Sequence, residues 1–473
     1  MKPPPEDNAR FAFVLAAIVS AVAMFGFTSI VVKQPWKKRV AAIEASLPEA
    51  SIVVATEDPV DAGEADAAEA GDAAVDAPPP VATAVPPGPF NVILVTIDTL
   101  RADLGFMGYP RPITPNMDEL AKKSAVFERT YTTASYTMKA LSALLTGRYA
   151  SEAYRDFNHY TLFPKDNVFL AERLKDGGVH TMAFHCHRYF GMRAGMEQGF
   201  DVWDMSAMPP NMVDADPRPT SKLVTDSAMR VLGKVEHVEG KPFFAWLHYF
   251  DPHSPYVGHE GAPAFAGLPT TAEKGARDVY DAEVWYTDVH LGRLFDWIAT
   301  QSWASTTALV VTADHGEAFG EKGFFRHNKE LWEPIVRVPL LLYIPGGPAT
   351  RISIKRSHVD LVPTILELMH VPATEPALRG KSLLADLRGG ALEERDVLLD
   401  MPEGQMNEHR RALITGPTPG MKLVERNTKI ELYDLATDEA EKEDLSRDEA
   451  KLAPIRTKFD AAFGALESRK PIR

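Results

Sequence analysis

Three apolar runs, each ending in polar residues, constrain the fold of this chain most strongly. They are "NVILVTID" at 91–98, "PFFAWLHYFD" at 242–251 and "TTALVVTADHGE" at 306–317. A continuous apolar run suits a strand buried on both faces of a mostly parallel sheet. Amphipathic patterns such as "TPNMDELAKKSAVF" and "VYDAEVWYTDVHLGRLFDWIA" lie between the runs. The alternation predicts an α/β fold with helices on both faces of the sheet.

The pattern changes after residue 345. "HVDLVPTILELM" predicts one helix, and "RRALITG", "MKLVERN" and "KIELYDLA" are short runs with turn residues between them. Such runs predict a small antiparallel sheet beside the main one. We therefore expect a main domain at 90–345 and a C-terminal subdomain of the same fold at 346–473.

The N-terminal region predicts a membrane anchor. Residues 11–32 follow a short tail, 1–10, and carry no charge. A helix of this length spans the ~30 Å hydrocarbon core. A cleaved signal peptide is the alternative, although its apolar part is usually only ~7–15 residues long. Four basic residues follow the segment, and the positive-inside rule would then place the large domain in the cytoplasm: Lys33, Lys37, Lys38 and Arg39.

Residues 33–89 predict a juxtamembrane segment and then a disordered linker rich in Ala, Pro and acids. Eight acids lie between Glu57 and Asp76 without a base. Such a stretch buries too little apolar surface to fold and is extended by its own charge. The whole chain has a net charge of −14, which argues against a general nucleic-acid binder. The single cysteine, Cys186, excludes an internal disulfide and a cysteine-built zinc site.

Polar side chains end the three apolar runs. They are Asp98, Asp251, Asp314 and His315. In open α/β sheets, functional sites gather at the carboxyl ends of strands, so we expect these side chains at one edge. Two carboxylates and an imidazole suit a divalent metal, which makes Asp98, Asp314 and His315 candidate ligands. Taken singly, each acid could instead cap a helix, and the histidine could be an ordinary core residue.

Nine phrases in the chain resemble the sulfatase family of the alkaline phosphatase superfamily. They are "NVILVTIDTLRAD", "GYPRPITPNMDELA", "ALLTGRY", "HYFDPHSPY", "YDAEVWYTDVHLGRL", "VTADHGEAFGEKG", "LWEPIVRVPLLLY", "HVDLVPTILELM" and "ELYDLATDEAEKEDL". They occur in family order from about residue 90 to residue 446, which is nearly all of the predicted folded region. The resemblance implies an alkaline-phosphatase-like fold and metal-dependent ester chemistry.

The resemblance also implies the metal site. It makes Asp98, Asp314 and His315 ligands of one divalent ion, which could be calcium, magnesium, manganese or zinc. Sulfatases usually have a second acid beside the first, and here that position is Thr99. Two-metal relatives have Asp and His four residues apart, whereas Asp251 and His253 are two apart. The resemblance therefore favours one metal over two.

The nucleophile implied by the resemblance is Thr137, counted back from Arg148 in "LLTGR". Typical sulfatases have Cys there, within Cys-x-Pro-Ser-Arg, and the cysteine is oxidised to formylglycine. This chain has "TMKAL" at 137–141, without Cys, Pro or Arg. It thus resembles the threonine-nucleophile branch, which includes phosphoethanolamine and glycerol-phosphate transferases. Alternatively, Thr137 is only the N-cap of the following helix.

Five further side chains complete the predicted site. Lys139 could hold a non-bridging oxygen of the ester, or it could be a solvated lysine. His253 aligns with a substrate-binding histidine of the family. His327 and Lys329 align with the segment that provides a cation or general acid, which makes His327 a candidate catalytic residue and Lys329 a candidate substrate-binding residue. His187 falls where the family has a substrate-binding lysine.

Chemistry at a threonine favours phosphate over sulfate. A threonine alkoxide could form a phosphothreonine that water or another hydroxyl then cleaves. A formylglycine hydrate expels sulfate through its second hydroxyl, which threonine lacks, so a sulfothreonine would be hard to clear. We expect a membrane-anchored hydrolase or transferase of phosphate esters. The alternatives are a sulfuric-ester hydrolase and a non-catalytic binding protein.

The predicted partners are a phosphate- or sulfate-ester substrate, such as a lipid or an envelope glycan, and the membrane. Relatives with anchors mostly act on envelope or extracellular substrates. The resemblance therefore places the domain in the periplasm, against the indication of the basic flank.

Overall fold

The computed structural model describes residues 84–472, except for 158–161, 192–193, 214–215, 235–240, 264–271 and 328. The predicted tail, the predicted anchor and most of the predicted linker lie outside these residues. No helix within the described part of the chain has the length and apolar character needed to cross a membrane.

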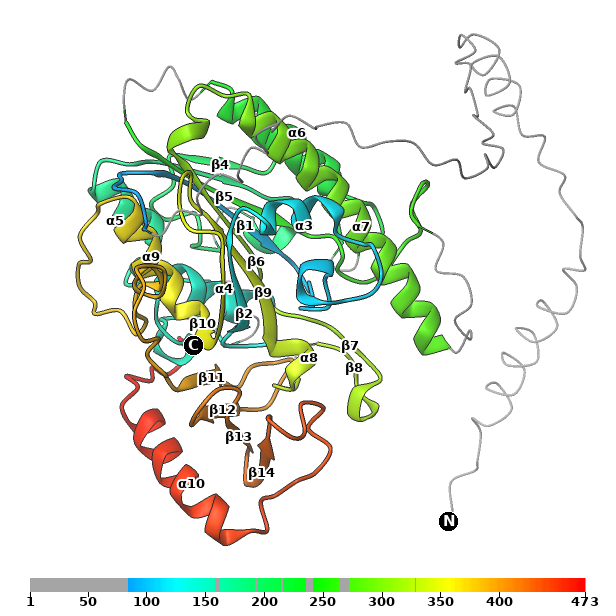
Figure 1. Cartoon of the computed structure of the whole chain (residues 1–473), viewed down its shortest axis with the longest axis vertical. Coiled ribbons are helices and arrows are strands. Elements are labelled where there is room, and N and C mark those ends of the chain that lie inside the picture. Colours follow the sequence, from blue (N-terminus) through cyan, green and yellow to red (C-terminus); the bar gives the residue numbers. More distant parts are fainter. Residues whose placement is uncertain are drawn as a thin grey trace, which may run out of the picture. The chain divides into compact units, whose positions relative to one another are not determined.

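An eight-stranded sheet forms the centre of the molecule, in the order β10-β2-β9-β6-β1-β5-β3-β4 (Figure 1). β9 is antiparallel to β2 and β6, and every other neighbouring pair is parallel. The mostly parallel sheet is thus confirmed. Its strands are β1 Asn91–Ile97, β2 Ala125–Tyr131, β3 His180–Phe184, β4 Val202–Asp204, β5 Phe243–Tyr249, β6 Thr307–Ala313, β9 Arg337–Tyr343 and β10 Thr350–Ser357.

The three apolar runs are the adjacent central strands β6, β1 and β5. Successive side chains of a strand point to opposite faces, so each of these strands has apolar residues on both faces. In β1, Val92 and Leu94 pack in one core cluster, while Ile93 and Val95 pack in another. The continuous apolar pattern therefore arises because both faces are covered.

Helices cover the two faces of the sheet, as predicted. The cluster that contains Val92 also contains residues of α4 Thr137–Thr146, α5 Leu170–Asp176 and α9 Leu361–Leu368. The cluster that contains Ile93 contains residues of α3 Pro115–Ala121, α6 Ser221–Leu232 and α7 Ala272–Ala299. Figure 1 shows α6 and α7 along one side of the sheet and α4, α5 and α9 on the other.

A four-stranded antiparallel sheet follows, with its strands in sequence order. It consists of β11 Val397–Met401, β12 Arg410–Thr415, β13 Met421–Arg426 and β14 Lys429–Asp434. One face packs on α10 Glu449–Gly464, and the other contacts the main layer through Tyr131 and Leu331. The predicted small sheet is confirmed. The residues after 345 contribute to both sheets. β10 is a strand of the eight-stranded sheet, and α9 packs on that sheet.

The segment between β6 and β9 contains little regular secondary structure. It contains the two-stranded hairpin β7 Ala318–Phe319 and β8 Phe325–Arg326, followed by α8 Glu333–Val336. This segment begins at the carboxyl end of β6 and returns to the start of β9. It therefore lies at the edge where the candidate ligands are expected.

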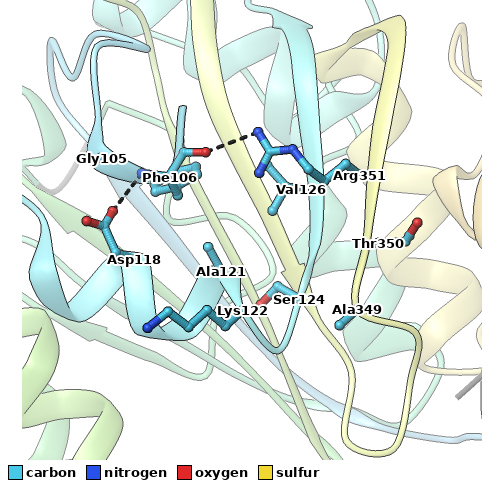
Figure 2. A pocket seen from close by; sticks show the side chains of 10 residues that line it. All are labelled: Gly105, Phe106, Asp118, Ala121, Lys122, Ser124, Val126, Ala349, Thr350 and Arg351. Carbon is cyan, nitrogen blue, oxygen red and sulfur yellow. Dashed lines mark hydrogen bonds between the residues drawn. The ribbon is translucent and has the colours of Figure 1, made fainter. Parts of the chain in front are cut away.

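A surface cleft of about 440 Å³ lies away from that edge. Its lining includes Ser124 and Thr350, at the amino ends of β2 and β10. Figure 2 shows Asp118 accepting from the Phe106 amide and Arg351 donating to the Phe106 carbonyl beside the cleft. None of the predicted site residues lines it.

Candidate active site

The three predicted metal ligands meet at the carboxyl ends of two paired strands. Asp98 directly follows β1, while Asp314 and His315 directly follow β6. One candidate ligand atom from each residue lies within 4.8 Å of the others, and all three residues are buried. His315 Nε2 is 3.9 Å from Asp98 Oδ1 and 3.5 Å from Asp314 Oδ2.

The hydrogen bonds of these three residues leave one atom of each residue available to bind a metal. Asp98 Oδ1 and Asp314 Oδ2 are buried without a hydrogen-bond partner. The other oxygen of Asp314 accepts from the backbone N–H groups of Thr99 and His315, at 3.1 and 2.7 Å. His315 Nδ1 lies 3.0 Å from the Gly316 carbonyl, which can only accept, so the lone pair is on Nε2.

This donor set fits one divalent metal. Buried carboxylate oxygens without partners are costly, and a cation between them removes that cost. Without a cation, burial and then the neighbouring charge of Asp314 raise the pKa of Asp98 to about 6. Asp98, Asp314 and His315 would hold the ion. Its identity stays a prediction, because oxygen-rich sites with one histidine suit several metals.

Thr137 lies directly beside this cluster. It is the first residue of α4, and its Oγ1 is 3.3 Å from His315 Nε2. The N-cap residue is Tyr136, whose side chain does not cap the helix. The alternative that Thr137 is only an N-cap is therefore wrong. Its place at the start of a ten-residue helix also gives it backbone N–H groups that favour an anion.

His327 and Glu317 form a hydrogen-bonded pair beside the metal ligands. His327 Nδ1 is 3.0 Å from Glu317 Oε1, and the Tyr256 hydroxyl donates to Glu317 Oε2 at 2.7 Å. The rings of His327 and His315 have centroids 4.6 Å apart. Because the carboxylate accepts from Nδ1, the Nε2 atom of His327 is left for another partner.

Two further histidines enclose one phenylalanine. The ring of Phe250 stacks on His187 at 4.6 Å and on His253 at 4.7 Å. The rings of His253 and His327 are 5.0 Å apart. Burial, and then the proximity of His327 and His187, hold the pKa of His253 well below its ordinary value. His253 is thus a neutral imidazole, and the structure brings His187, His253 and His327 to the same edge as Thr137.

The two predicted lysines differ in burial. Lys139 is buried, and its Nζ donates to the Pro402 carbonyl at 2.8 Å and to Asn407 Oδ1. Burial, and then the charge of Arg155, lower the pKa of Lys139 to about 7. These contacts tie α4 to the loop between β11 and β12. Lys329 is exposed, two residues beyond His327. The substrate roles of both lysines stay predictions.

The carboxylate of Asp251 is hydrogen-bonded to other groups of the protein. It accepts hydrogen bonds from the backbone N–H and hydroxyl groups of Thr220 and Ser221, at the start of α6. Within the described residues, the only cluster of three candidate ligands is that of Asp98, Asp314 and His315. The number of metal ions stays a prediction.

Sequence reasoning missed Glu317, Tyr256 and His248. Glu317 stands two residues after His315 in "DHGE", which was a usable signal. His248 lies in the apolar strand β5, and nothing in the pattern distinguished it from a core residue.

Carboxylates, a histidine and a hydroxyl gather at the carboxyl edge of this sheet, and this set of groups suits metal-dependent ester hydrolysis. The sequence model of the Sulfatase family matches residues 90–371. The chain therefore belongs to the sulfatase family, and it is a sulfatase-family hydrolase.

Relatives agree with this assignment. The "Uncharacterized sulfatase YidJ" of Escherichia coli is 23% identical over 452 residues, which cover 81% of this chain and 88% of the relative. The phosphonate monoester hydrolase of Agrobacterium radiobacter is a structural neighbour with a TM-score of 0.62 and 19% identity, covering 79% of this chain and 94% of its own. Another neighbour, solved with its substrate D-glucosamine-2-N,6-O-disulfate, has a TM-score of 0.64 and 17% identity, covering 80% and 99%. These two structures support the fold.

Proposed function

We propose that this chain is a metal-dependent hydrolase or transferase of phosphate esters, with Thr137 as the nucleophile. The main observation is the 3.3 Å separation between Thr137 Oγ1 and His315 Nε2, beside two buried carboxylate oxygens without partners. No cysteine stands at this position, and the single cysteine, Cys186, is buried elsewhere. The nucleophile is therefore a hydroxyl that formylglycine chemistry does not modify.

The reaction follows from the side chains at the edge. Thr137 Oγ1 attacks phosphorus, an Oγ1–P bond forms, and the bond from phosphorus to the leaving oxygen breaks. The hydroxyl proton of Thr137 passes to water, and the leaving oxygen takes up a proton, for which protonated His327 is a candidate donor. Water, or an acceptor hydroxyl, then attacks phosphorus and restores the Thr137 hydroxyl. Hydrolysis and transfer differ only in that second nucleophile.

A divalent ion at Asp98, Asp314 and His315 would supply positive charge that makes a neighbouring hydroxyl more acidic and stabilises negative charge on the ester. The chain's own residues do the positioning. Glu317 holds His327 by its Nδ1 atom, and the stack with Phe250 holds His253 and His187. Lys139, by contrast, is held by Pro402 and Asn407.

A second candidate is a sulfuric-ester hydrolase. The names of the relatives favour it, since YidJ and the other curated relatives are called sulfatases. The name of the phosphonate monoester hydrolase neighbour, which has the same fold, supports phosphorus chemistry instead. The difficulty for sulfate is chemical, because Thr137 has no second hydroxyl through which to expel it. A non-catalytic binding protein is the third candidate, and the intact metal cluster counts against it.

The predicted anchor at residues 11–32 belongs to this proposal. It would tether the domain to a membrane, with the domain in the periplasm and with lipid or envelope-glycan esters within reach. Protease added to intact spheroplasts should then degrade the domain. Full protection would place it in the cytoplasm, as the basic flank indicates.

The deciding experiment compares matched aryl phosphates, phosphodiesters and sulfates on the wild type, Thr137→Ala and Thr137→Ser. Phosphate-ester turnover should vanish in Thr137→Ala and survive in part in Thr137→Ser, which keeps the hydroxyl. High-accuracy intact mass should reveal a phosphate adduct on the wild type but not on Thr137→Ala. Thr137-dependent sulfate turnover above both phosphate activities would favour the second candidate, and no turnover with metal supplied would favour the third.

A further inference from the structure

His248 is a buried histidine next to the metal cluster, and the chemistry above does not use it. It lies in β5, is 1% exposed, and is the register partner of Thr96 in β1. Its Nε2 atom is buried without a hydrogen-bond partner and lies 3.8 Å from Asp98 Oδ2. A polar atom in this position is costly unless it serves a neighbouring group.

The contacts on the other side of the ring favour one tautomer of His248. Trp246 Nε1, which can only donate, gives its hydrogen to Thr96 Oγ1 at 2.9 Å. Thr96 Oγ1 then has its own hydrogen to donate, and His248 Nδ1 at 2.8 Å is a nearer acceptor than the Leu247 carbonyl at 3.5 Å. These distances favour Nδ1 of His248 as the acceptor, because the hydroxyl hydrogen of Thr96 then makes the shorter bond. A neutral His248 in this arrangement has its hydrogen on Nε2, the atom that faces Asp98.

We propose that His248 is a positioning residue for the metal ligand Asp98. Its Nε2–H donates to Asp98 Oδ2 and so presents Oδ1, the oxygen near His315, to the ion. This inference rests on the metal site of the proposed function. The two atoms are 3.8 Å apart, and an approach of roughly 0.6 Å brings them into the ordinary N–H···O range. Groups that orient metal ligands typically contribute about 10–100-fold in metal affinity.

The residue after Asp98 makes such support more important. Thr99 has no carboxylate to offer the ion, although its Oγ1 atom is also buried without a partner. Asp98 and Asp314 are then the two acids of the site, and Asp314 is already oriented by two backbone N–H groups. His248 would give Asp98 the orientation that Asp314 obtains from the backbone.

Two other roles for His248 make different predictions. As a direct fourth ligand it would need its lone pair on Nε2, which is opposite to the tautomer that Thr96 and Trp246 favour. As a purely structural ring it would serve through its contacts with Phe190 and Trp246, at 5.1 and 6.0 Å between ring centroids. A phenylalanine could then replace it without loss of metal affinity.

The test measures the dissociation constant of the full chain for Mn²⁺ and Zn²⁺ by chelator competition. His248→Phe should weaken binding about 10–100-fold. His248→Gln should restore most of that loss, because an amide N–H can replace Nε2–H. His185→Phe is the matched control, since His185 packs on the same Phe190 and Trp246 rings and should leave the affinity unchanged.

A second pair of variants changes Thr96, the hydrogen-bond partner of His248 Nδ1, and leaves the histidine itself in place. Thr96→Val removes the hydroxyl that favours this tautomer and should weaken metal binding, whereas Thr96→Ser should not. Unchanged affinity in both His248→Phe and Thr96→Val would overturn the inference in favour of a structural ring. Equal losses in His248→Gln and His248→Phe, with a second nitrogen ligand in X-ray absorption, would overturn it in favour of a direct ligand. If the wild type binds neither ion and Asp314→Ala matches it, the metal site itself fails.

Discussion

Asp314 and Asp251 occupy equivalent places in the sheet, yet they have opposite surroundings. Asp314 directly follows β6, and Asp251 lies two residues beyond β5, on either side of β1. Asp314 keeps one buried oxygen without a partner, whereas the Asp251 carboxylate receives hydrogen bonds from four groups of Thr220 and Ser221. A strand-end carboxylate is therefore a candidate ligand only where the protein leaves it an oxygen.

The largest effect should come from removing the carboxylate with the available oxygen. Asp314→Ala takes away one of three candidate ligands, so the purified protein should lose its bound divalent metal and its turnover. Metal analysis and ester assays measure both. Loss of the ion should also lower the melting temperature when metal is supplied, because binding to the folded state alone adds stability. Equal metal content in the variant and the wild type would contradict the ligand assignment.

Asp251→Ala should behave in the opposite way. It leaves the N–H groups of Thr220 and Ser221 buried without an acceptor, which costs about 1–3 kcal/mol in the free energy of unfolding. Denaturant unfolding measures that loss. Metal content should stay at the wild-type level, since Asp251 is outside the cluster. A loss of metal without a loss of stability would mean that Asp251 is a ligand after all.

The comparison also shows what the sequence could predict. β1, β5 and β6 were predictable because both of their faces are buried, and the pairing of β1 with β6 made the meeting of Asp98 with Asp314 predictable as well. The hydrogen bonds of the Asp251 carboxylate were not predictable. Its partners, Thr220 and Ser221, are about thirty residues earlier in the chain, and only the folded structure brings them together.

Other secondary-structure elements could not be recognised in the sequence because of their local composition or length. Val126 and Phe127 continue the apolar spacing of the preceding helix, so "TPNMDELAKKSAVF" appeared as one helix, although α3 ends at Ala121 and β2 begins at Ala125. The edge strand β10 is rich in charge, and β4 has only three residues. For Lys139, the sequence could indicate its closeness to Thr137 but not its contact with Pro402, because that partner comes from the small sheet.

A smaller effect should appear in the pH dependence of metal binding. The pKa of Asp98 is raised to about 6 by burial and by Asp314, so the ion must displace a proton below that pH. The dissociation constant should therefore rise by up to about tenfold per pH unit below 6. In metal-free protein, a raised folded-state pKa adds stability below the unfolded value of 3.8, and that stability is lost as the pH rises through 6.

Titration calorimetry in two buffers of different ionisation enthalpy measures the released proton, and unfolding at several pH values measures the metal-free trend. Asp98→Asn removes the titrating group and should abolish both trends. A metal affinity that does not change between pH 5 and 7 would contradict the buried, protonated carboxyl.

The smallest effect on turnover should come from Lys139, and it separates a contact with substrate from a contact with the small sheet. The folded-state pKa of Lys139 is about 7, below its ordinary value of 10.5, so the unfolded chain binds more protons between these pH values. Stability should therefore rise with pH in this window, by at most about 1.4 kcal/mol per pH unit. Lys139→Met should flatten that slope, as measured by denaturant unfolding from pH 7 to pH 10. Because Lys139 Nζ is held by Pro402 and Asn407, kcat for aryl phosphates should change little after correction for folded protein. A large fall in kcat with an unchanged pH slope would show instead that Lys139 turns from Pro402 to the ester.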